Sequence, residues 1–527
     1  MAYSLRQNIA GDYRHTLKDG VEEGLNAVPA NAQFPEMVDP GVSYPVFPTF
    51  HEQFAHLATI RGAVDAIVDS GGAITFAQLE SRTNQLARLF QEYDVKSGDY
   101  VLISTASPSL LLQSAIAAWK VGAVPMPVSD RMVQAELDAI IRLGNPRIVV
   151  DTTSRTVSVP RIASFDRLHE YSSDALPSVV PPHLKVPTSG GSTGLPKLIL
   201  SGAPGEPASI IQLGQTMGVP TDGICLITAA LYHNAPFSDA LAALALGNTT
   251  VVMERFDPEA TLEMIEKHRA TWVYFVPTMM QRIWRLPEEV KYKYDLSSVE
   301  TFFHVAAPCP PWLKREWINW VGAETIYELY GPTEGQAATA ITGTEWLDHP
   351  GSVGRAVVGE VTVRDEDGKE VAPGVTGEVW LRRGADEPPA YHYVGAESES
   401  FDEGWETVGD IGWMDDEGYL YLTDRRSDML LVGGVNVYPA EIEAVSDMHP
   451  TVLSSCVVGL DDPELGKVPA MVIETGDGAI PADFHDFLSA QLSGAKLPRQ
   501  VVATTQRLRD HAGKMRKRDI KADFFEA

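Results

Sequence analysis

The sequence contains only three cysteines, Cys225, Cys309 and Cys456, among 527 residues. They are far apart, odd in number and lack the spacing of metal ligands, which excludes a disulfide framework and argues against a zinc site. Long apolar runs are also missing, since none approaches the roughly 18 residues that a membrane span needs. The first residues lack the apolar core of a secretory signal. We therefore expect a cytoplasmic protein without a membrane span.

Basic residues are scarce as well. The chain has 42 Lys and Arg compared with 71 Asp and Glu, which gives a net charge of −29. Such an acidic chain is a poor binder of nucleic acids or anionic membranes. A polyanionic ligand such as a nucleotide would need backbone amides, a few placed cations and a metal ion. The remaining composition, 44% hydrophobic and 21% charged, is that of a globular protein long enough for two to four domains.

Strand and helix patterns alternate over most of the chain. Apolar strands are expected at residues 100–105, 249–253 and 271–276, and amphipathic helices at 110–120 and 258–269. Such alternation predicts an α/β fold with wound parallel sheets and crossover helices. In addition, Thr75 and Gln78 form a capping-box signature that opens a further helix.

The pattern changes from about residue 341 to short strands and glycine-rich turns, which predicts a small antiparallel or barrel-like subdomain. After the charged stretch Asp424–Asp428 comes a compact α+β tail. We place a domain boundary there, with an N-terminal domain of residues 1–424 and a small C-terminal domain of residues 425–527. No repeats of 20–50 residues occur, which excludes solenoids and propellers.

The segment Thr188–Lys197 is rich in glycine, serine and threonine. Its glycines allow successive backbone N–H groups to face one anion, while Ser192 and Thr193 add hydroxyl donors and Lys197 adds a charge. It is not a Walker A loop, because Pro196 rather than glycine precedes the lysine. Taken alone, the segment fits a phosphate cradle and a flexible surface hairpin equally well.

Further motifs follow in a fixed order. They are Tyr327–Glu334, Gly409-Asp410, Asp424-Arg425, Gly433-Gly434 before Tyr438–Glu441, and Gly513-Lys514. Together with the glycine-rich segment they resemble the adenylate-forming superfamily of acyl-CoA synthetases, adenylation domains and luciferases over about residues 50–520. The resemblance implies a large N-terminal domain of two wound mixed sheets and a small β-barrel-like subdomain, hinged to a small α+β C-terminal domain that carries a catalytic lysine.

In that family a carboxylate attacks the α-phosphate of ATP, which gives an acyl-adenylate and pyrophosphate, and a second nucleophile then takes the acyl group. The resemblance implies that Thr333 binds the α-phosphate, Glu334 binds Mg²⁺ and Asp410 binds the ribose hydroxyls. The residues it assigns to ATP binding are Ser189, Gly190, Gly191, Ser192, Thr193, Gly194, Lys197, Ala306, Ala307, Pro308, Tyr330, Gly331, Thr333, Asp410 and Arg425.

Two further catalytic residues are implied. Lys514 would reach between the substrate carboxylate and the α-phosphate and cancel their repulsion. Considered without the motif series, Lys514 also fits a solvated lysine in the basic run 514–518. His233 would orient the carboxylate and gate the thiol channel, although a lone histidine also fits a partly buried core residue.

The candidate acyl pocket consists of Tyr232, His233, Asn234, Phe237, Val276, Met279 and Met280. Its apolar character fits an aromatic, alicyclic or fatty acid. Asn234 stands where amino-acid adenylation domains carry an aspartate that pairs with the substrate ammonium, which argues against an α-amino acid. Met279 and Met280 fit ordinary core positions just as well.

In the resembled enzymes the C-terminal domain rotates about a hinge between the two half-reactions. That motion would remove Lys514 and bring Gly433 and Gly434 beside the pantetheine thiol. Three positions depart from the family pattern. In the phosphate loop Gly190 replaces serine or threonine, and in the hinge stretch Asp424 replaces glycine and Ser427 replaces aspartate or lysine.

We therefore expect an ATP- and Mg²⁺-dependent ligase that adenylates a hydrophobic carboxylic acid and passes it to coenzyme A. One alternative is an adenylating enzyme whose acceptor is an amine or a carrier-protein thiol. An alternative of another class is a non-catalytic acyl or nucleotide sensor. The identity of the acid and the oligomeric state remain open.

Overall fold

The computed structural model describes residues 45–526, except residues 154, 191–195, 385–386, 397, 399–403, 434, 493 and 511–512. Within this part of the chain, the structure has no helix that combines the length and the apolar character required to cross a membrane.

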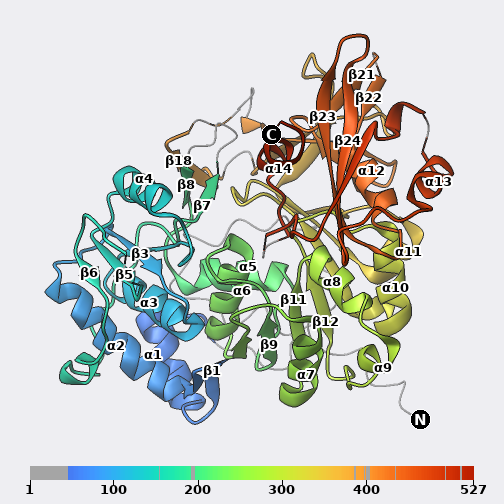
Figure 1. Cartoon of the computed structure of the whole chain (residues 1–527). Coiled ribbons are helices and arrows are strands. Elements are labelled where there is room, and N and C mark those ends of the chain that lie inside the picture. The colour runs from blue at the N-terminus through green and yellow to red at the C-terminus, as the bar shows by residue number, and fades with distance from the viewer. Residues whose placement is uncertain are drawn as a thin grey trace. The chain divides into compact units, whose positions relative to one another are not determined.

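The largest sheet has nine strands in the order β15-β14-β13-β12-β11-β9-β10-β1-β2 (Figure 1). Strands β1 and β9 to β13 run parallel to their neighbours within this group, and β2, β14 and β15 add antiparallel edges. The strands are β1 (Asp65–Asp69), β2 (Gly72–Thr75), β9 (Ile224–Ile227), β10 (Thr249–Val252), β11 (Trp272–Phe275), β12 (Thr301–His304), β13 (Ile326–Tyr330), β14 (Ala338–Thr342) and β15 (Arg355–Val358).

Helices cross between these strands, as the alternating pattern predicts. They are α5 (Pro207–Thr216), α6 (Asn234–Ala245), α7 (Pro258–His268), α8 (Pro277–Trp284), α9 (Glu288–Lys291), α10 (Pro311–Val321) and α11 (Gly343–Asp348). Helix α6 packs on α5 and against β9 and β10 (Figure 1). Local signals set the ends: Asp257 caps α7 by accepting from the Ala260 N–H, and Pro258 takes the first turn, where no hydrogen-bond donor is needed.

A second, parallel sheet has the strand order β4-β3-β5-β6. Its strands are β3 (Tyr100–Ser104), β4 (Val124–Pro127), β5 (Ile148–Asp151) and β6 (Arg161–Ile162), and the helices of this region are α1 (Phe50–Ile60), α2 (Phe76–Glu92), α3 (Pro108–Lys120) and α4 (Gln134–Gly144). The predicted capping box of Thr75 and Gln78 is confirmed at the start of α2. The Ser107 side chain caps α3 by accepting from the Leu110 N–H, and Pro108 takes the first helical position.

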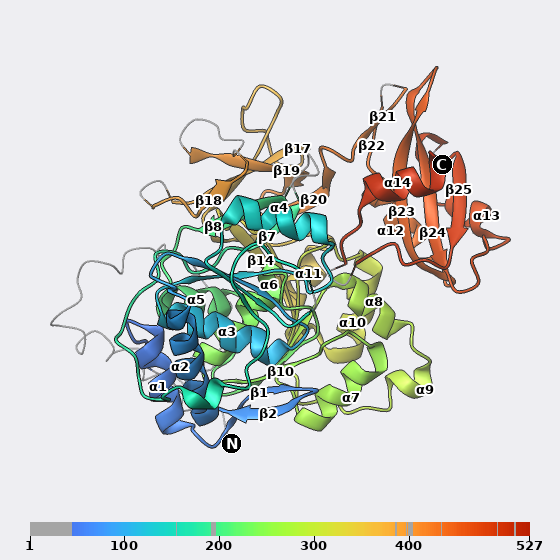
Figure 2. The ribbon, with the colours of Figure 1, turned by 60° about the vertical axis from the view of Figure 1, so that its left-hand side comes forward.

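The structure has two smaller antiparallel sheets (Figure 2). They confirm the predicted change to short strands from about residue 341. One has the order β18-β8-β7 and the other β16-β17-β19-β20. Their strands are β7 (Thr188–Gly190), β8 (Pro196–Ser201), β16 (Glu360–Arg364), β17 (Gly377–Arg382), β18 (Tyr391–Val394), β19 (Glu406–Met414) and β20 (Leu420–Arg425). Strand β18 pairs with β8, the strand that begins with Pro196 and Lys197, although the two strands are almost 200 residues apart in the sequence.

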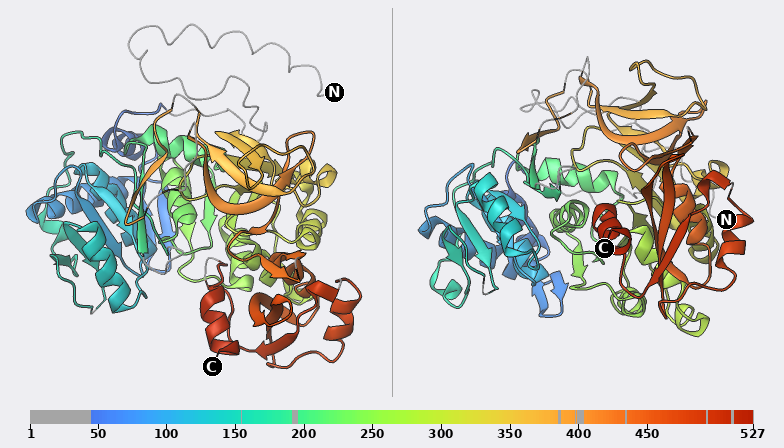
Figure 3. Two further views of the ribbon diagram at one scale, coloured as in Figure 1. Left: turned by 90° about the horizontal axis from the view of Figure 1, so that it is seen from above. Right: turned by 45° about the horizontal axis from the view of Figure 1, so that its top comes forward.

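The C-terminal segment forms a sheet of its own with order β22-β21-β24-β23 and β25 beside β24 (Figure 3). Its elements are β21 (Leu430–Val432), β22 (Val435–Val437), α12 (Pro439–Ser446), β23 (Val452–Asp462), β24 (Gly466–Thr475), α13 (Phe484–Ser489), β25 (Gln500–Thr504) and α14 (Lys517–Phe525). The domain boundary after Asp424 coincides with the end of β20 and stays a prediction.

A buried ion pair ties strand β13 to helix α10. The Lys314 ammonium donates to the Glu328 carboxylate, and both side chains are at most 6% exposed. His304 on the neighbouring strand lies 3.8 Å from the other oxygen of Glu328. Burial raises the pKa of Glu328, whereas burial and the Lys314 charge lower the pKa of His304. The Lys314–Glu328 ion pair therefore fixes the position of β13, the strand that ends at Tyr330.

Replacing Lys314 by alanine should leave Glu328 buried without its cation and lower the free energy of unfolding by about 3–5 kcal/mol. Urea denaturation followed by tryptophan fluorescence measures this change. The control is Asn319→Ala on the exposed side of the same helix, which should change stability by about 0.5 kcal/mol or less. Equal effects of the two substitutions would contradict the structural role of the pair.

Candidate active site

Glu334 is the centre of a compact polar group between three segments. Its Oε1 lies 3.1 Å from the Lys197 ammonium and accepts a hydrogen bond from the Tyr393 hydroxyl. Lys197 also donates to the Tyr393 oxygen at 2.7 Å and lies 4.0 Å from the centre of its ring. The three side chains therefore fix one another, with Glu334 only 9% exposed.

Backbone pairing explains how these residues meet. Lys197 is on β8, and β18 pairs with β8 so that Tyr393 lies opposite Ile199. Glu334 follows β13 in the turn after Gly331, next to Thr333, and Gly335 completes the turn with a φ of 73°. Tyr393 had no signal in the sequence, because only the β8–β18 pairing brings it to Lys197.

The glycine-rich segment forms a hairpin, with Ser189 opposite Lys197 and Gly190 opposite Pro196. The predicted phosphate-binding residues Gly191, Ser192, Thr193 and Gly194 lie outside the described residues. Lys197 belongs to the stem of this hairpin and pairs with Glu334. The stem therefore connects the predicted phosphate loop with the polar group of Lys197, Glu334 and Tyr393.

A second carboxylate, Asp410 on β19, is held through both oxygens. Its Oδ2 accepts from the Tyr330 hydroxyl at 2.6 Å and its Oδ1 from the Arg425 guanidinium at 3.2 Å. Arg425 lies directly opposite Asp410 in the β19–β20 pair. Burial and the adjacent Asp410 charge raise the pKa of Tyr330 well above its usual range. The structure therefore brings together Tyr330, Asp410 and Arg425, as the resemblance implies.

Lys514 is carried on a tight turn near the C-terminus. Its N–H donates to Asp510 Oδ1 at 2.9 Å, and Gly513 closes the turn with a φ of 75°. A Cβ on Gly513 would lie 2.6 Å from the Thr278 hydroxyl and 3.3 Å from Val276, so only glycine fits this close approach. The turn therefore rests on the end of β11, where the candidate acyl pocket begins.

The charges of the polar groups described above act on the Lys514 ammonium. Partial desolvation and the Arg425 charge lower its pKa, while Asp510 and Glu334 act in the opposite direction. The side chain itself keeps contact with solvent. The lysine, the arginine and Glu334 are thus close enough to influence one another across the turn.

The three residues Ala306, Ala307 and Pro308 follow β12 at the same edge of the sheet. Ala306 has a φ of 76°, a conformation that L-residues adopt at a cost in free energy. Ala306 and Pro308 are exposed. Their role as the surface that the adenine lies against stays a prediction.

The candidate acyl pocket residues flank the start of α6 and the β11–α8 junction. His233 immediately precedes α6, and its ring centre lies 4.3 Å from that of Tyr232. Burial and the nearby Asp510 charge raise the pKa of Tyr232, which places the Lys514 turn beside this pocket. Phe237, Val276, Met279 and Met280 are all buried in the main core, and their contact with a substrate stays a prediction.

The predicted hinge and thiol-channel residues lie in the C-terminal segment. Asp424 accepts from the Ala440 N–H at 2.9 Å, and the Ser427 hydroxyl donates to Asp428. Gly433 donates to the Leu465 carbonyl at 2.8 Å, so its turn packs against its own sheet. Gly434 lies outside the described residues. The structure therefore brings the Lys514 turn, rather than the Gly433 turn, against the end of β11.

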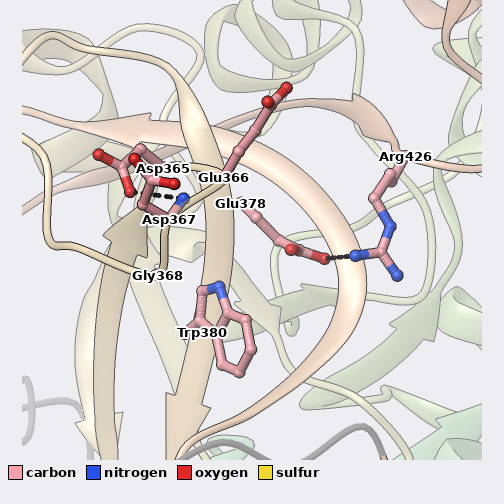
Figure 4. A pocket seen from close by; sticks show the side chains of 7 residues that line it. All are labelled: Asp365, Glu366, Asp367, Gly368, Glu378, Trp380 and Arg426. Carbon is pink, nitrogen blue, oxygen red and sulfur yellow. Dashed lines mark hydrogen bonds and ion pairs between the residues drawn. The ribbon is translucent and has the colours of Figure 1, made fainter.

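Figure 4 shows a separate hollow on the sheet of β16, β17, β19 and β20. It is lined by Asp365, Glu366, Asp367, Gly368, Glu378, Trp380 and Arg426. Asp365 accepts from two backbone N–H groups of its own turn, and Arg426 pairs with Glu378 at 2.8 Å. Its excess of carboxylates repels phosphates, so this hollow does not suit a nucleotide.

The cations and carboxylates around Glu334 suit a nucleotide and its metal ion. Lys197 pairs with Glu334, Arg425 pairs with Asp410, and the charges of Arg425 and Glu334 act on Lys514, in an otherwise acidic protein. Mg²⁺ is usually held by one or two carboxylates together with substrate phosphates, and Glu334 is a carboxylate of this kind. The described residues contain no group of three or more His, Cys, Asp or Glu side chains arranged to hold a metal ion.

Comparison with known proteins identifies the family. Residues 54–385 match the AMP-binding enzyme family, which is more than half of the chain. The chain belongs to the AMP-binding enzyme family. It is 28% identical to a feruloyl-CoA synthase of Amycolatopsis, over 87% of this chain and 96% of that protein. It is 25% identical to a 2-succinylbenzoate–CoA ligase of Bacillus licheniformis, over 86% and 95% of the two chains.

Solved structures of adenylate-forming enzymes share the fold. ATP-bound MatB from Rhodopseudomonas palustris superposes with a TM-score of 0.77 at 24% identity, over 90% of this chain and 99% of that one. The amide bond synthetase McbA from Marinactinospora thermotolerans gives 0.74 at 24% identity, over 90% and 100%. The expected α/β class with a large sheet-rich N-terminal domain is thereby confirmed.

Replacing Tyr393 by phenylalanine should weaken binding of MgATP about tenfold, because a hydrogen bond to a charged group contributes about 1.5 kcal/mol. Isothermal titration calorimetry with Mg²⁺ and a non-hydrolysable ATP analogue measures this loss. The matched control is Tyr391→Phe on the same strand, whose hydroxyl donates to Glu406 at 2.8 Å instead. If both substitutions weaken binding equally, Tyr393 has no special role in positioning Lys197 and Glu334.

Proposed function

We propose that this chain is an ATP- and Mg²⁺-dependent acid–thiol ligase that activates a carboxylic acid as its adenylate and transfers the acyl group to coenzyme A. The observation that carries the proposal is the position of the Lys514 turn. It rests against Val276 and Thr278 at the acyl pocket and interacts with Arg425 and Glu334 at the nucleotide site.

This position suits the first half-reaction. A carboxylate oxygen forms a bond to the α-phosphorus, the bond to the bridging oxygen breaks, and pyrophosphate leaves. Two anions must approach each other, so positioning and neutralisation supply much of the rate. Lys514 would bridge the two anions, and Lys197 would hold the outer phosphates. Mg²⁺ held by Glu334 would supply Lewis-acid charge to the phosphates.

The arrangement around Asp410 suits the nucleoside. A carboxylate accepts hydrogen bonds from both hydroxyls of a ribose when its oxygens are fixed in direction. The Tyr330 and Arg425 contacts fix both oxygens of Asp410. Ala306, Ala307 and Pro308 would lie against the adenine, with Tyr330 on its other side.

The names of the relatives favour coenzyme A as the acceptor, because a feruloyl-CoA synthase and a 2-succinylbenzoate–CoA ligase both match nearly the whole chain. In the second half-reaction the thiol sulfur attacks the acyl carbon and AMP leaves. We propose that the Gly433 turn approaches the pocket in that step, about a hinge at Ser427. An amine acceptor is the second candidate, which the shared fold of an amide bond synthetase keeps open.

We also propose that the protein acts in the cytoplasm. Cys225, Cys309 and Cys456 are free thiols, which suits a reducing compartment.

The test combines the protein with ATP, Mg²⁺ and a panel of fatty, aryl and alicyclic acids, with coenzyme A present or omitted. Pyrophosphate release and mass spectrometry of the acyl products are the measurements. A thioester that forms only with coenzyme A supports the ligase. Adenylate without thioester would redirect the work to an amine or a carrier thiol, and no acid-dependent pyrophosphate would favour a sensor.

Lys514→Ala should lower adenylate formation from acid and ATP about 100-fold or more, because one group that stabilises transition-state charge is lost. Thioester formation from preformed adenylate and coenzyme A should stay within about threefold of wild type, because the lysine acts only in the first step. Pyrophosphate release and thioester absorbance measure the two steps separately.

The matched control is Arg518→Ala, which removes an exposed charge from the same basic run. It should leave both steps unchanged. An equal loss in Arg518→Ala would mean that the run acts through its general charge, and loss of both half-reactions in Lys514→Ala would contradict the two-conformation mechanism.

A further inference from the structure

Helix α8 ends at a side chain that reaches the C-terminal segment. Arg285 directly follows α8, and its guanidinium donates to the backbone carbonyl of Asp447 at 3.0 Å. Asp447 in turn directly follows α12, and the last carbonyls of a helix lack partners within the helix and carry partial negative charge. A cation on one side of the predicted domain boundary thus satisfies a helix end on the other side.

The Asp447 carboxylate is influenced by two arginines. It is 5% exposed and accepts a hydrogen bond from the Ser455 hydroxyl at 2.7 Å. Burial raises the pKa of Asp447 to about 6, while the charge of Arg509, the Ser455 hydrogen bond and the charge of Arg285 act in the opposite direction. The two arginines therefore stabilise the charged form of this carboxylate, one from each side of the predicted boundary.

Arg509 connects this region with the Lys514 turn. Its Nε donates to the Ser454 hydroxyl at 3.2 Å, and a second guanidinium nitrogen donates to the Gly513 carbonyl at 3.0 Å. Ser454 is buried on β23 next to Ser455. A continuous series of contacts therefore leads from the end of α8 through β23 to the turn that carries Lys514.

The start of α8 contacts the same turn directly. A Cβ on Gly513 would lie 2.6 Å from the Thr278 hydroxyl, so the turn lies against the first residues of α8. Helix α8 has eight residues and is about 12 Å long, which separates this contact from the one at Arg285. A single contact leaves a domain free to turn about it, whereas two separated contacts restrict its orientation. The Arg285 hydrogen bond therefore helps to determine how the C-terminal segment meets the acyl pocket.

This hydrogen bond is formed in the orientation that brings the Lys514 turn to α8. In the second half-reaction as proposed above, the Gly433 turn approaches the pocket instead, and rotation of the C-terminal segment would separate Asp447 from Arg285. Two orientations that alternate in every turnover differ little in free energy, so the loss of one hydrogen bond shifts their populations. The bond thus favours the first half-reaction alone.

We propose that Arg285 is a positioning residue for the first half-reaction, which holds the C-terminal segment through Asp447 in the orientation that places the Lys514 turn at the acyl pocket. The proposal rests on the adenylating function above and names a residue outside the family motifs that controls one of its two steps. The rival explanation is that Arg285 only stabilises the fold, since the charge of Glu474 attracts it as well. The two explanations differ in which half-reaction depends on Arg285.

The experiment measures the two half-reactions separately with the full chain. The acid is the member of the panel above with the highest rate of acid-dependent pyrophosphate release, and its chemically prepared adenylate serves for the second step. Arg285→Met removes the hydrogen-bond donor and keeps an apolar stem. We expect pyrophosphate release to fall about tenfold or more, because a hydrogen bond from a charged group is lost. Thioester formation from the adenylate and coenzyme A should stay within about threefold of wild type or rise.

The ratio of the two rates decides between the explanations, because a loss of stability would lower both rates together. Equal losses in both half-reactions, or an unchanged rate of pyrophosphate release, would overturn the proposal and leave the adenylating function intact. Absence of acid-dependent pyrophosphate with the wild-type protein and every acid would instead count against the adenylating function itself.

Two further variants test the contact. Arg285→Lys keeps an ammonium that can donate to the Asp447 carbonyl, and it should restore pyrophosphate release to within about threefold of wild type. A loss as large as in the methionine variant would rule the hydrogen bond out as the cause. Asp447→Asn keeps the shape of the side chain but removes the charge that attracts Arg285 and Arg509, and it should lower pyrophosphate release about fivefold while sparing the thioester step. This variant decides the matter if the methionine variant does not fold, since an unchanged ratio in it contradicts the proposal.

The matched control is Arg315→Met on the neighbouring helix α10. Arg315 is exposed, and its guanidinium lies 5.5 Å from the centre of the Trp346 ring, within the same predicted domain. The substitution removes the same charge and should leave both half-reactions unchanged. An equal loss of pyrophosphate release in this variant would attribute the effect of Arg285→Met to general charge and rule the proposal out.

Discussion

The ion pair between Lys197 and Glu334, closed by the Tyr393 hydroxyl, is the interaction on which the proposed site depends. It joins the stem of the glycine-rich hairpin to the turn after β13, and it holds both charges in place in a protein of strongly negative net charge. A polyanion can bind such a protein only where cations are fixed locally. The β8–β18 pairing provides that fixation.

The buried carboxylates of the protein differ in their hydrogen-bond and ion-pair partners, and these partners suit different roles. Glu328 is fully buried with Lys314 and serves to anchor β13. Asp410 is held on both oxygens by Tyr330 and Arg425, which suits a group that must face a ligand in one orientation. Asp239 is buried without a hydrogen-bond partner among the described residues, and burial raises its pKa well above the usual range.

The position of the C-terminal segment also has a local physical cause. Gly513 allows its turn to approach Thr278 and Val276 so closely that a side chain would clash. Lys517 is 3.0 Å from Glu443 and 3.5 Å from Asp428, and these acidic partners raise its pKa against the effect of burial. Asp428 and Glu443 are thereby tied to α14, the last helix.

The sequence by itself determined the alternation of strands and helices, the capping box at Thr75, and the order of motifs that includes Lys197, Glu334, Asp410, Arg425 and Lys514. These features are local, because periodicity and turn chemistry act over a few residues. The expected helix at residues 110–120 instead begins at Pro108, since the Ser107 side chain caps it by accepting from the Leu110 N–H. Only the tertiary structure decided that Tyr393 joins Lys197 and that Lys314 pairs with Glu328. Strand pairing and helix packing unite residues that are distant in the chain, and no local pattern records such contacts.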